Sequence, residues 1–197
     1  MSIITLQNFI DHHKPGELTQ IPGRDLIESY RTLLPDSLLE LWEKTGIGAY
    51  SNGLIQIINP GDYKRALYDW LMLDDEDPSR LPIAISSFGT IFYYRKLSDE
   101  GDEDIAYIDP HVSGTDVLAW SLESFFNDYL CNEENISSSL DPDLFEKALR
   151  KEGQLDKNQM YLFAPALRLG SQRDIKFIKR GDTLVHLDIL LQLALDN

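Results

Sequence analysis

The chain has 197 residues, 43% of them hydrophobic and 26% charged, the balance of an ordinary globular protein that can bury a core. Its 18 Lys and Arg residues stand against 33 Asp and Glu residues, so the formal net charge is −15. A field of this sign repels phosphate backbones and anionic lipid, which argues against nucleic acid or a membrane as a partner. A basic protein would be attracted, although acidity also serves solubility alone.

The negative charge is concentrated in the first three quarters of the chain. Residues 1–149 hold ten basic and 27 acidic residues, whereas residues 150–197 hold eight and six. The N-terminus lacks the basic and apolar regions of a signal peptide, and no apolar run is long enough to span a membrane. The single cysteine, Cys131, has no partner for an internal disulfide and fits a reducing compartment. We therefore expect a cytoplasmic protein, monomeric or weakly dimeric.

In chain order, the first predicted elements are two short helices over residues 24–33 and 35–45, because Pro35 is allowed only in a first helical turn. The second helix leads into Gly46-Ile47-Gly48, which looks at first like the start of a phosphate-binding loop. Such a loop must follow a strand and precede a helix. Here the order is reversed, since a helix comes first and the alternating run 54–58 follows.

We therefore interpret these glycines as structural. Gly46 is predicted to be the left-handed residue that ends a helix, and Asn52-Gly53 to be a turn that opens a strand.

A third helix is predicted around residues 63–71. After it, apolar residues recur every second residue instead of every three to four, which is the period of a strand. Short β-rich runs are predicted at residues 81–88, 90–95, 105–109 and 116–120. They are joined by Gly89, by the acidic loop 99–104 and by residues 110–114. Connections this short suit hairpins, so an antiparallel meander is expected rather than a parallel sheet.

The last third is predicted to be mainly helical. An aromatic-rich helix covers residues 121–130, and a helix with Asp141 as N-cap ends before Gly153. Residues 160–169 contain Pro165 and are expected to form an edge strand or extended segment. Residues 183–195 are apolar nearly all round, which indicates a buried closing helix.

These elements predict an α+β fold: a central antiparallel meander packed by helices, with a mainly helical C-terminal part. We expect an α+β domain over residues 1–130, a linker over the serine-containing stretch 131–140, and a C-terminal subdomain over residues 141–197 that packs on it.

Patterns for catalysis or metal binding are weak. The four histidines are scattered, and no His-x-x-x-His, Cys-x-x-Cys or Gly-x-Ser-x-Gly motif is present. Asp109 and His111 could share a metal, but a turn at Asp109-Pro110 explains Asp109 equally well. Cys131 follows an aromatic helix, where a buried, inert thiol is the usual state. We predict no catalytic residues, no metal and no cofactor.

Two acidic loops are the candidate contacts for a partner. The loop 99–104 evokes a calcium loop but lacks the order of ligands that such loops need, so a solvated hairpin loop is the better interpretation. The residues proposed for partner binding are Asp74, Asp75, Glu76, Asp77, Asp99, Glu100, Asp102, Glu103 and Asp104.

Several longer stretches resemble a known family, the GAD-like domain followed by the C-terminal domain of type VI secretion immunity proteins, which protect bacteria from a DNase effector. These stretches are "LPDSLLELWEKTGIGAYSNGLIQIINPGDY", "ALYDWL", "FGTIFYY", "GQLDKNQMYLFAPALRLG" and "HLDILLQLA". The resemblance implies a cytoplasmic, non-enzymatic protein that binds a toxin and blocks it. It implies no individual contact residues, because the shared positions are mostly glycines and apolar residues.

Three hypotheses remain open from the sequence. The leading one is an immunity protein whose acidic face pairs with the cationic cleft of a cognate basic nuclease. The second is a cytosolic module that binds a small molecule or peptide. The third is a metal-dependent hydrolase that uses Asp109 and His111.

Overall fold

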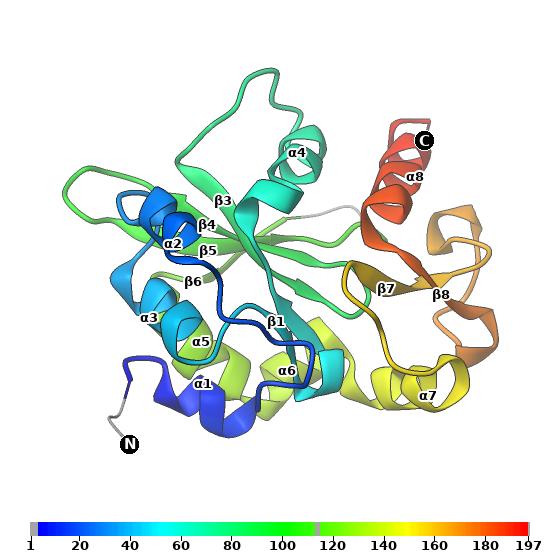
Figure 1. Ribbon diagram of the computed structural model, residues 1–197. Helices are drawn as coiled ribbons and strands as arrows, with labels where there is room; N and C mark the ends of the chain where they lie inside the picture. Colours follow the sequence, from blue (N-terminus) through cyan, green and yellow to red (C-terminus); the bar gives the residue numbers. More distant parts are fainter. Residues whose placement is uncertain (1–3, 113–114, 197) are drawn as a thin grey trace.

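A six-stranded antiparallel sheet forms the centre of the protein, with helices on both faces and a two-stranded sheet beside it (Figure 1). The computed structural model describes residues 4–112 and 115–196, so residues 113 and 114 of the predicted connection 110–114 lie outside the described ranges, as do residues 1–3 and 197. The predicted α+β class and the antiparallel meander are confirmed.

The helices and strands follow one another in an order that matches most of the predicted elements. The helices are α1 (Gln7–His12), α2 (Arg24–Tyr30), α3 (Asp36–Lys44), α4 (Pro60–Trp70), α5 (Leu122–Asn127), α6 (Glu133–Leu140), α7 (Pro142–Glu152) and α8 (Thr183–Leu195). The strands are β1 (Gly48–Tyr50), β2 (Ile55–Ile57), β3 (Arg80–Ser86), β4 (Ile91–Lys96), β5 (Glu103–Ile108), β6 (Val117–Ala119), β7 (Gln159–Phe163) and β8 (Ile178–Asp182).

Strands β1 to β6 lie in the sheet in sequence order, and each is antiparallel to the next. The end of β4 therefore lies beside the start of β5, where Lys96 is opposite Glu103. The start of β3 and the end of β6 lie at this same end of the sheet, since Arg80 is opposite Arg95 and Ala119 is opposite Ile105. Three connections consequently meet there: the loop before β3, the β4–β5 turn and the residues after β6.

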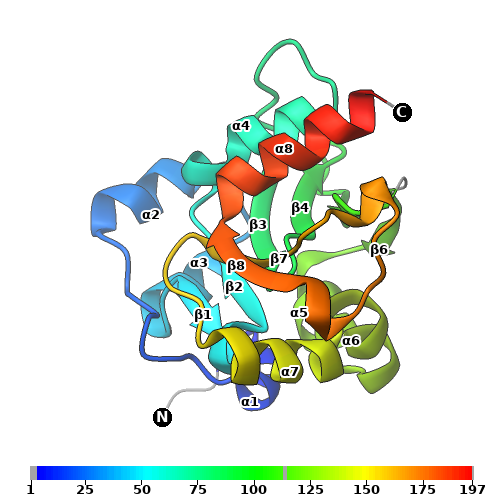
Figure 2. The ribbon, with the colours of Figure 1, turned by 90° about the vertical axis from the view of Figure 1, so that its right-hand side faces the viewer.

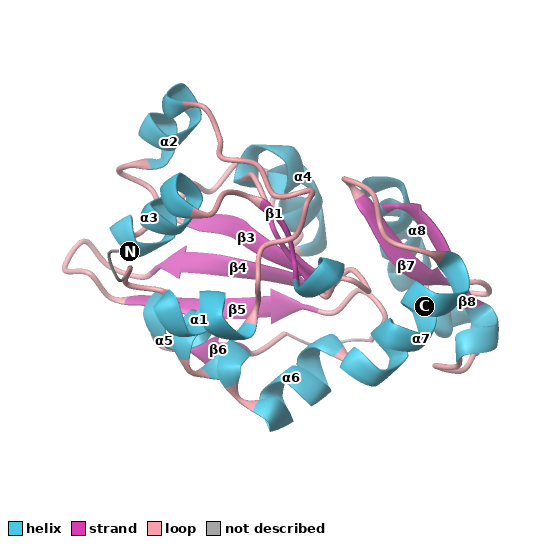
Figure 3. Cartoon of the chain, turned by 60° about the horizontal axis from the view of Figure 1, so that its bottom comes forward, coloured by secondary structure: helices cyan, strands magenta, loops and turns pink. Residues whose placement is uncertain are grey.

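The two faces of the large sheet bury separate clusters. On the first face, helices including α3 and α5 cover the sheet (Figure 3), and the buried cluster there includes Trp42, Phe125 and Phe92 of β4. On the second face, α4 and α8 cover neighbours such as Ile91 and Tyr93. Because side chains alternate along a strand, consecutive residues of β4 serve opposite clusters, which explains why the middle strands are apolar on both sides.

The small sheet of β7 and β8 is joined to the large one through the β3–β4 turn. The backbone N–H of Tyr161 donates to the carbonyl oxygen of Ser87 at 2.8 Å. Ahead of β7, helix α7 begins and ends as predicted, with the Asp141 side chain capping the Leu144 N–H and Gly153 in the left-handed region at φ 83°.

The glycine-rich stretch after α3 is a hairpin that packs tightly on the N-terminal segment. Gly46 has φ 91°, as expected for a residue that ends a helix. A Cβ atom on Gly46 or Gly48 would also lie 2.6 Å from backbone atoms of Gln20 or Leu18, respectively. These glycines therefore allow two backbones to approach, and the structural interpretation of the motif is confirmed.

Residues 131–140, predicted to be a linker, are mostly helical. Helix α6 is capped by Asn132, whose side-chain oxygen accepts from the N–H groups of Glu134 and Asn135 at 3.0 and 3.1 Å. Its last residue, Leu140, is fully buried in the first-face cluster. Serine-rich composition suggested a loop, but a good cap and a buried apolar end favour the helix. The division into domains at residues 1–130 and 141–197 stays a prediction.

Candidate functional site

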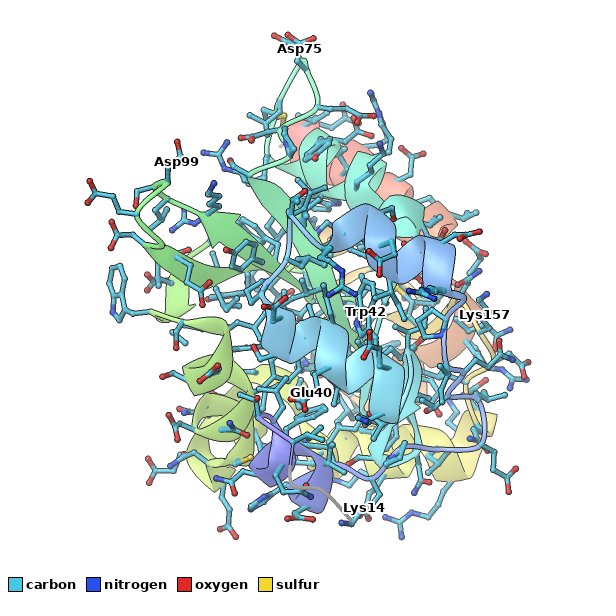
Figure 4. All side chains as sticks on the ribbon, turned by 60° about the vertical axis from the view of Figure 1, so that its left-hand side comes forward. Lys14, Glu40, Trp42, Asp75, Asp99 and Lys157 are labelled. Atoms are coloured by element: carbon cyan, nitrogen blue, oxygen red, sulfur yellow. The ribbon has the colours of Figure 1, made fainter. Side chains whose placement is uncertain are left out.

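The two acidic stretches proposed as partner contacts, 74–77 and 99–104, lie at the same end of the large sheet. The first belongs to the loop between α4 and β3, and the second spans the β4–β5 turn and the start of β5. The residues that flank the two stretches are hydrogen-bonded, since the Lys96 N–H donates to the Ser79 carbonyl oxygen at 2.8 Å. Asp75 and Asp99 mark two separate projections in Figure 4. We call residues 71–79, 97–103 and 120 together the acidic end.

In the first loop, half of the carboxylates hold the loop in place. Glu76 pairs with Lys64 of α4 at 2.7 Å. Asp77 accepts from the Ser79 N–H at 2.9 Å and forms an ion pair with Arg80, so its charge is largely neutralised. These contacts anchor the loop to α4 and to the start of β3.

In the second stretch, the last two acids face the protein. Asp104 is buried, and both of its oxygens accept from the Arg95 guanidinium at 2.7 Å. Glu103 accepts from the backbone N–H of Leu122 at 2.8 Å, at the start of α5. Both carboxylates stabilise the hairpin and its junction with α5 rather than stand free in solvent.

Two of the three carboxylates of the turn itself are held by protein groups. Asp99 pairs with Lys96 at 2.6 Å, which lowers the pKa of Asp99. Asp102 accepts from the Ser98 hydroxyl at 2.8 Å. Among the described residues, no group of three or more His, Cys, Asp or Glu side chains is placed to hold a metal ion.

What remains at the acidic end is a mixture of free charge and exposed apolar surface. Within the described ranges, Asp74, Asp75 and Glu100 form no ion pair, and all three are exposed. The acidic end also exposes three large apolar side chains. Trp120 is 76% exposed, and the other two are Met72 and Leu97. Sequence patterns did not reveal these three, because Trp, Leu and Met are ordinarily expected inside.

Asp109 and His111 form a turn. The Asp109 carboxylate accepts from the backbone N–H of His111 at 2.8 Å, and the His111 Nε2 atom bonds the Phe88 carbonyl oxygen at 2.8 Å. Burial lowers the pKa of His111. The turn that the sequence offered as the alternative to a metal site is therefore the arrangement that the structure contains.

The structure also brings together a serine and a histidine that the sequence did not link. His13 Nδ1 lies 2.9 Å from Ser51 Oγ, while Nε2 bonds the Leu130 carbonyl oxygen at 2.7 Å. Both ring nitrogens are thus engaged, and burial lowers the pKa of His13. The histidine ties the end of α1 to the β1–β2 connection and to the segment before α6. Its orienting partner is a backbone carbonyl rather than the carboxylate of a Ser-His-Asp triad.

Cys131 is half-buried, and its Sγ atom lies 3.3 Å from the Phe126 carbonyl oxygen. Burial raises the pKa of Cys131 to about 11, so the side chain is a thiol and a poor nucleophile at neutral pH. No helix within the described ranges is long and apolar enough to cross a membrane.

Comparison with known proteins assigns the chain to a class. Residues 4–101 match the GAD-like domain, and residues 119–194 match the C-terminal domain of the type VI secretion system (T6SS) immunity protein Tdi1. The chain therefore belongs to the family of T6SS immunity proteins that carry a GAD-like domain, a family whose members bind a cognate toxin.

A solved structure shares the fold. The crystal structure of Atu4351 from Agrobacterium tumefaciens superimposes with a TM-score of 0.71, over 94% of this chain and 88% of that one, at 20% sequence identity. A search of curated proteins finds no match.

Proposed function

We propose that this immunity protein neutralises a basic T6SS toxin, a DNase, by covering its cationic DNA-binding surface with the acidic end. In this proposal the protein acts in the cytoplasm as a monomer or weak dimer, without catalysis and without binding nucleic acid itself. The observation that carries the proposal is that one end of the sheet exposes three carboxylates without an ion pair, Asp74, Asp75 and Glu100, together with the indole of Trp120.

In this proposal, charge acts on the association of the two proteins and apolar surface on their dissociation. A net charge of −15 attracts a cationic partner over a distance, which raises the association rate and makes it sensitive to salt. Once the partners touch, a few apolar anchors control dissociation, and Trp is among the residues that most often carry this role. We expect an interface near the ~1,600 Å² of total buried area that is typical of specific complexes.

The test uses the toxin domain of the cognate T6SS effector. Charge reversal of Asp74, Asp75 and Glu100 to Lys should weaken binding and abolish rescue of growth. The matched control reverses Glu133, Glu134 and Glu146, which are exposed on α6 and α7, and so changes the net charge equally. If both triple variants lose affinity equally, bulk charge and not the acidic end is responsible. If the wild-type protein neither binds the toxin nor prevents its degradation of plasmid DNA, the proposed function is wrong.

Trp120→Ala gives the second measurement. We expect the dissociation rate to rise about tenfold or more, with little change in the association rate, because an anchor contributes after the encounter. A change confined to the association rate would contradict the anchor role.

A further inference from the structure

Helix α8 covers the second face of the sheet with only one of its sides. Leu187 and Leu190, on the inner side of α8, are fully buried. Val185 is 60% exposed and Ile189 45% exposed, one helical turn apart on the outer side, and Leu184 is exposed as well. The expectation of a buried closing helix is therefore wrong for this side. An exposed apolar row on an otherwise polar surface is typical of a contact with another protein.

On the side of α8 that faces α4, the two helices enclose a groove of about 180 Å³. The two helices run side by side in Figures 1 and 2, and the groove between them is lined by Ala66 and Trp70 from α4 and by Leu184, Leu187 and Leu191 from α8. Its volume is below the ~300–1,000 Å³ of most pockets for small molecules. It suits one apolar side chain presented by a larger partner.

The rims of the groove are acidic on both sides. Asp62 lies on the α4 rim and Asp188 on the α8 rim, and within the described residues neither forms an ion pair. A third acid, Asp69, is neutralised by Arg65 at 2.7 Å. A cation beside the groove would therefore meet two unpaired carboxylates, one from each helix.

We propose that this groove receives a helix of the toxin whose apolar side chain enters between α4 and α8 while flanking Lys or Arg residues reach Asp62 and Asp188. Burying Leu184 and the other apolar side chains that line the groove supplies the affinity, and the two carboxylates select a basic partner. The acidic rims and the net charge of −15 oppose a second copy of this chain or an anionic lipid surface at the same place.

The groove and the acidic end are continuous. Trp70 is the last residue of α4 and lines the groove, and the loop that carries Asp74 and Asp75 begins directly after it. The Tyr68 hydroxyl donates to the Asp77 carbonyl oxygen at 2.8 Å and holds that loop to the helix. One partner can thus contact both the groove and the acidic end. This inference rests on the proposed function, since it names a second contact of the same toxin.

Substitutions at Leu184 test the groove, because this side chain lines it and is 39% exposed, so it can change without disturbing the core. Leu184→Arg removes the apolar contact and adds a charge that repels a basic partner, whereas Leu184→Glu removes the contact but adds attraction. With the toxin domain as probe, we expect Kd to rise about thirtyfold or more for Leu184→Arg and clearly less for Leu184→Glu. Ile21→Arg is the matched control, since Ile21 is an exposed aliphatic residue on the segment between α1 and α2.

The outcomes separate the two proposals. If the wild-type protein binds the toxin, and the acidic-end variants weaken binding while both Leu184 variants do not, the groove inference is overturned and the proposed function stands. An equal loss for Arg and Glu overturns the selection of a basic helix. If Leu184→Arg instead converts a dimer into a monomer in light scattering, a second copy covers the groove and the inference of a toxin helix is overturned. Absence of any toxin binding by the wild-type protein removes both proposals together.

Discussion

The two faces of the large sheet are closed to different degrees. The first face lies under α1, α3, α5 and α6, and its cluster extends through α7 into the small sheet. The second face is covered by α4 and α8, which leave a groove between them and an exposed apolar row on α8. The more completely covered face therefore accounts for most of the stability. The less completely covered face keeps apolar surface available to a partner, as binding surfaces do.

Truncating a buried side chain in either cluster should lower the free energy of unfolding more than the other changes considered below. The loss should be larger on the first face than on the second. Phe125 is fully buried on the first face and lies 5.4 Å, centroid to centroid, from Phe92. We expect Phe125→Ala to lower the free energy of unfolding by about 3–5 kcal/mol. Leu187→Ala, on the second face, should cost about 2–3 kcal/mol, because its cavity would open toward the groove and the site can relax. Denaturant unfolding of both variants measures the difference.

An equal or larger loss for Leu187→Ala would contradict the comparison, since it would show that the second face is as tightly closed as the first.

Local chemistry made much of this fold predictable from the sequence. Asp141 and Pro142 mark the start of α7, because a capping carboxylate and a fixed φ suit the first helical turn. The short connections before and after β4 required an antiparallel meander, since parallel strands need long crossovers. In each case the deciding atoms are within a few residues of one another.

Features set by distant parts of the chain were not predictable. Gly48 approaches the backbone of Leu18, thirty residues earlier, and no local pattern encodes that contact. Whether Trp120 is covered depends on which segments reach the end of the sheet. The apolar sequence of α8 indicates burial everywhere, yet the elements that pack against it, namely α4, the small sheet and the 3-10 turn Leu167–Leu169, leave Val185 and Ile189 exposed. For the acidic loops, the sequence located the charges but not the ion pair of Asp104 with Arg95 that removes one of them from the surface.

The pH dependence of stability tests the surroundings of His186, where α8 meets the small sheet. The expected change in the free energy of unfolding is of intermediate size. Burial, and then the neighbouring His111, lower the pKa of His186 to about 4. The unfolded chain, with a His pKa near 6.5, therefore binds protons that the folded state refuses, so stability is lost as pH falls from about 6.5 toward 4. Between pH 7.5 and pH 5 the contribution of His186 should be about 2 kcal/mol.

The control for this titration is His186→Leu, which removes the titrating group from an apolar site. Over the same pH range, its stability should fall by about 2 kcal/mol less than that of the wild-type protein. Parallel curves for the two proteins would mean that His186 is protonated as readily in the folded state as in the unfolded one.

The smallest effect on stability is expected at the exposed row of α8, and it is the most specific test of the comparison. Ile189 lies one turn from Val185 on the outer side of the helix, two residues after the buried Leu187. Ile189→Ala should change the free energy of unfolding by no more than about 1 kcal/mol, because nearly half of the residue is already exposed to water. Alanine has the higher helix propensity, so the sign can even be favourable. A loss near that of Leu187→Ala would show that this side of α8 is covered in solution by the protein itself, and Val185 and Ile189 would then offer no apolar surface to a partner.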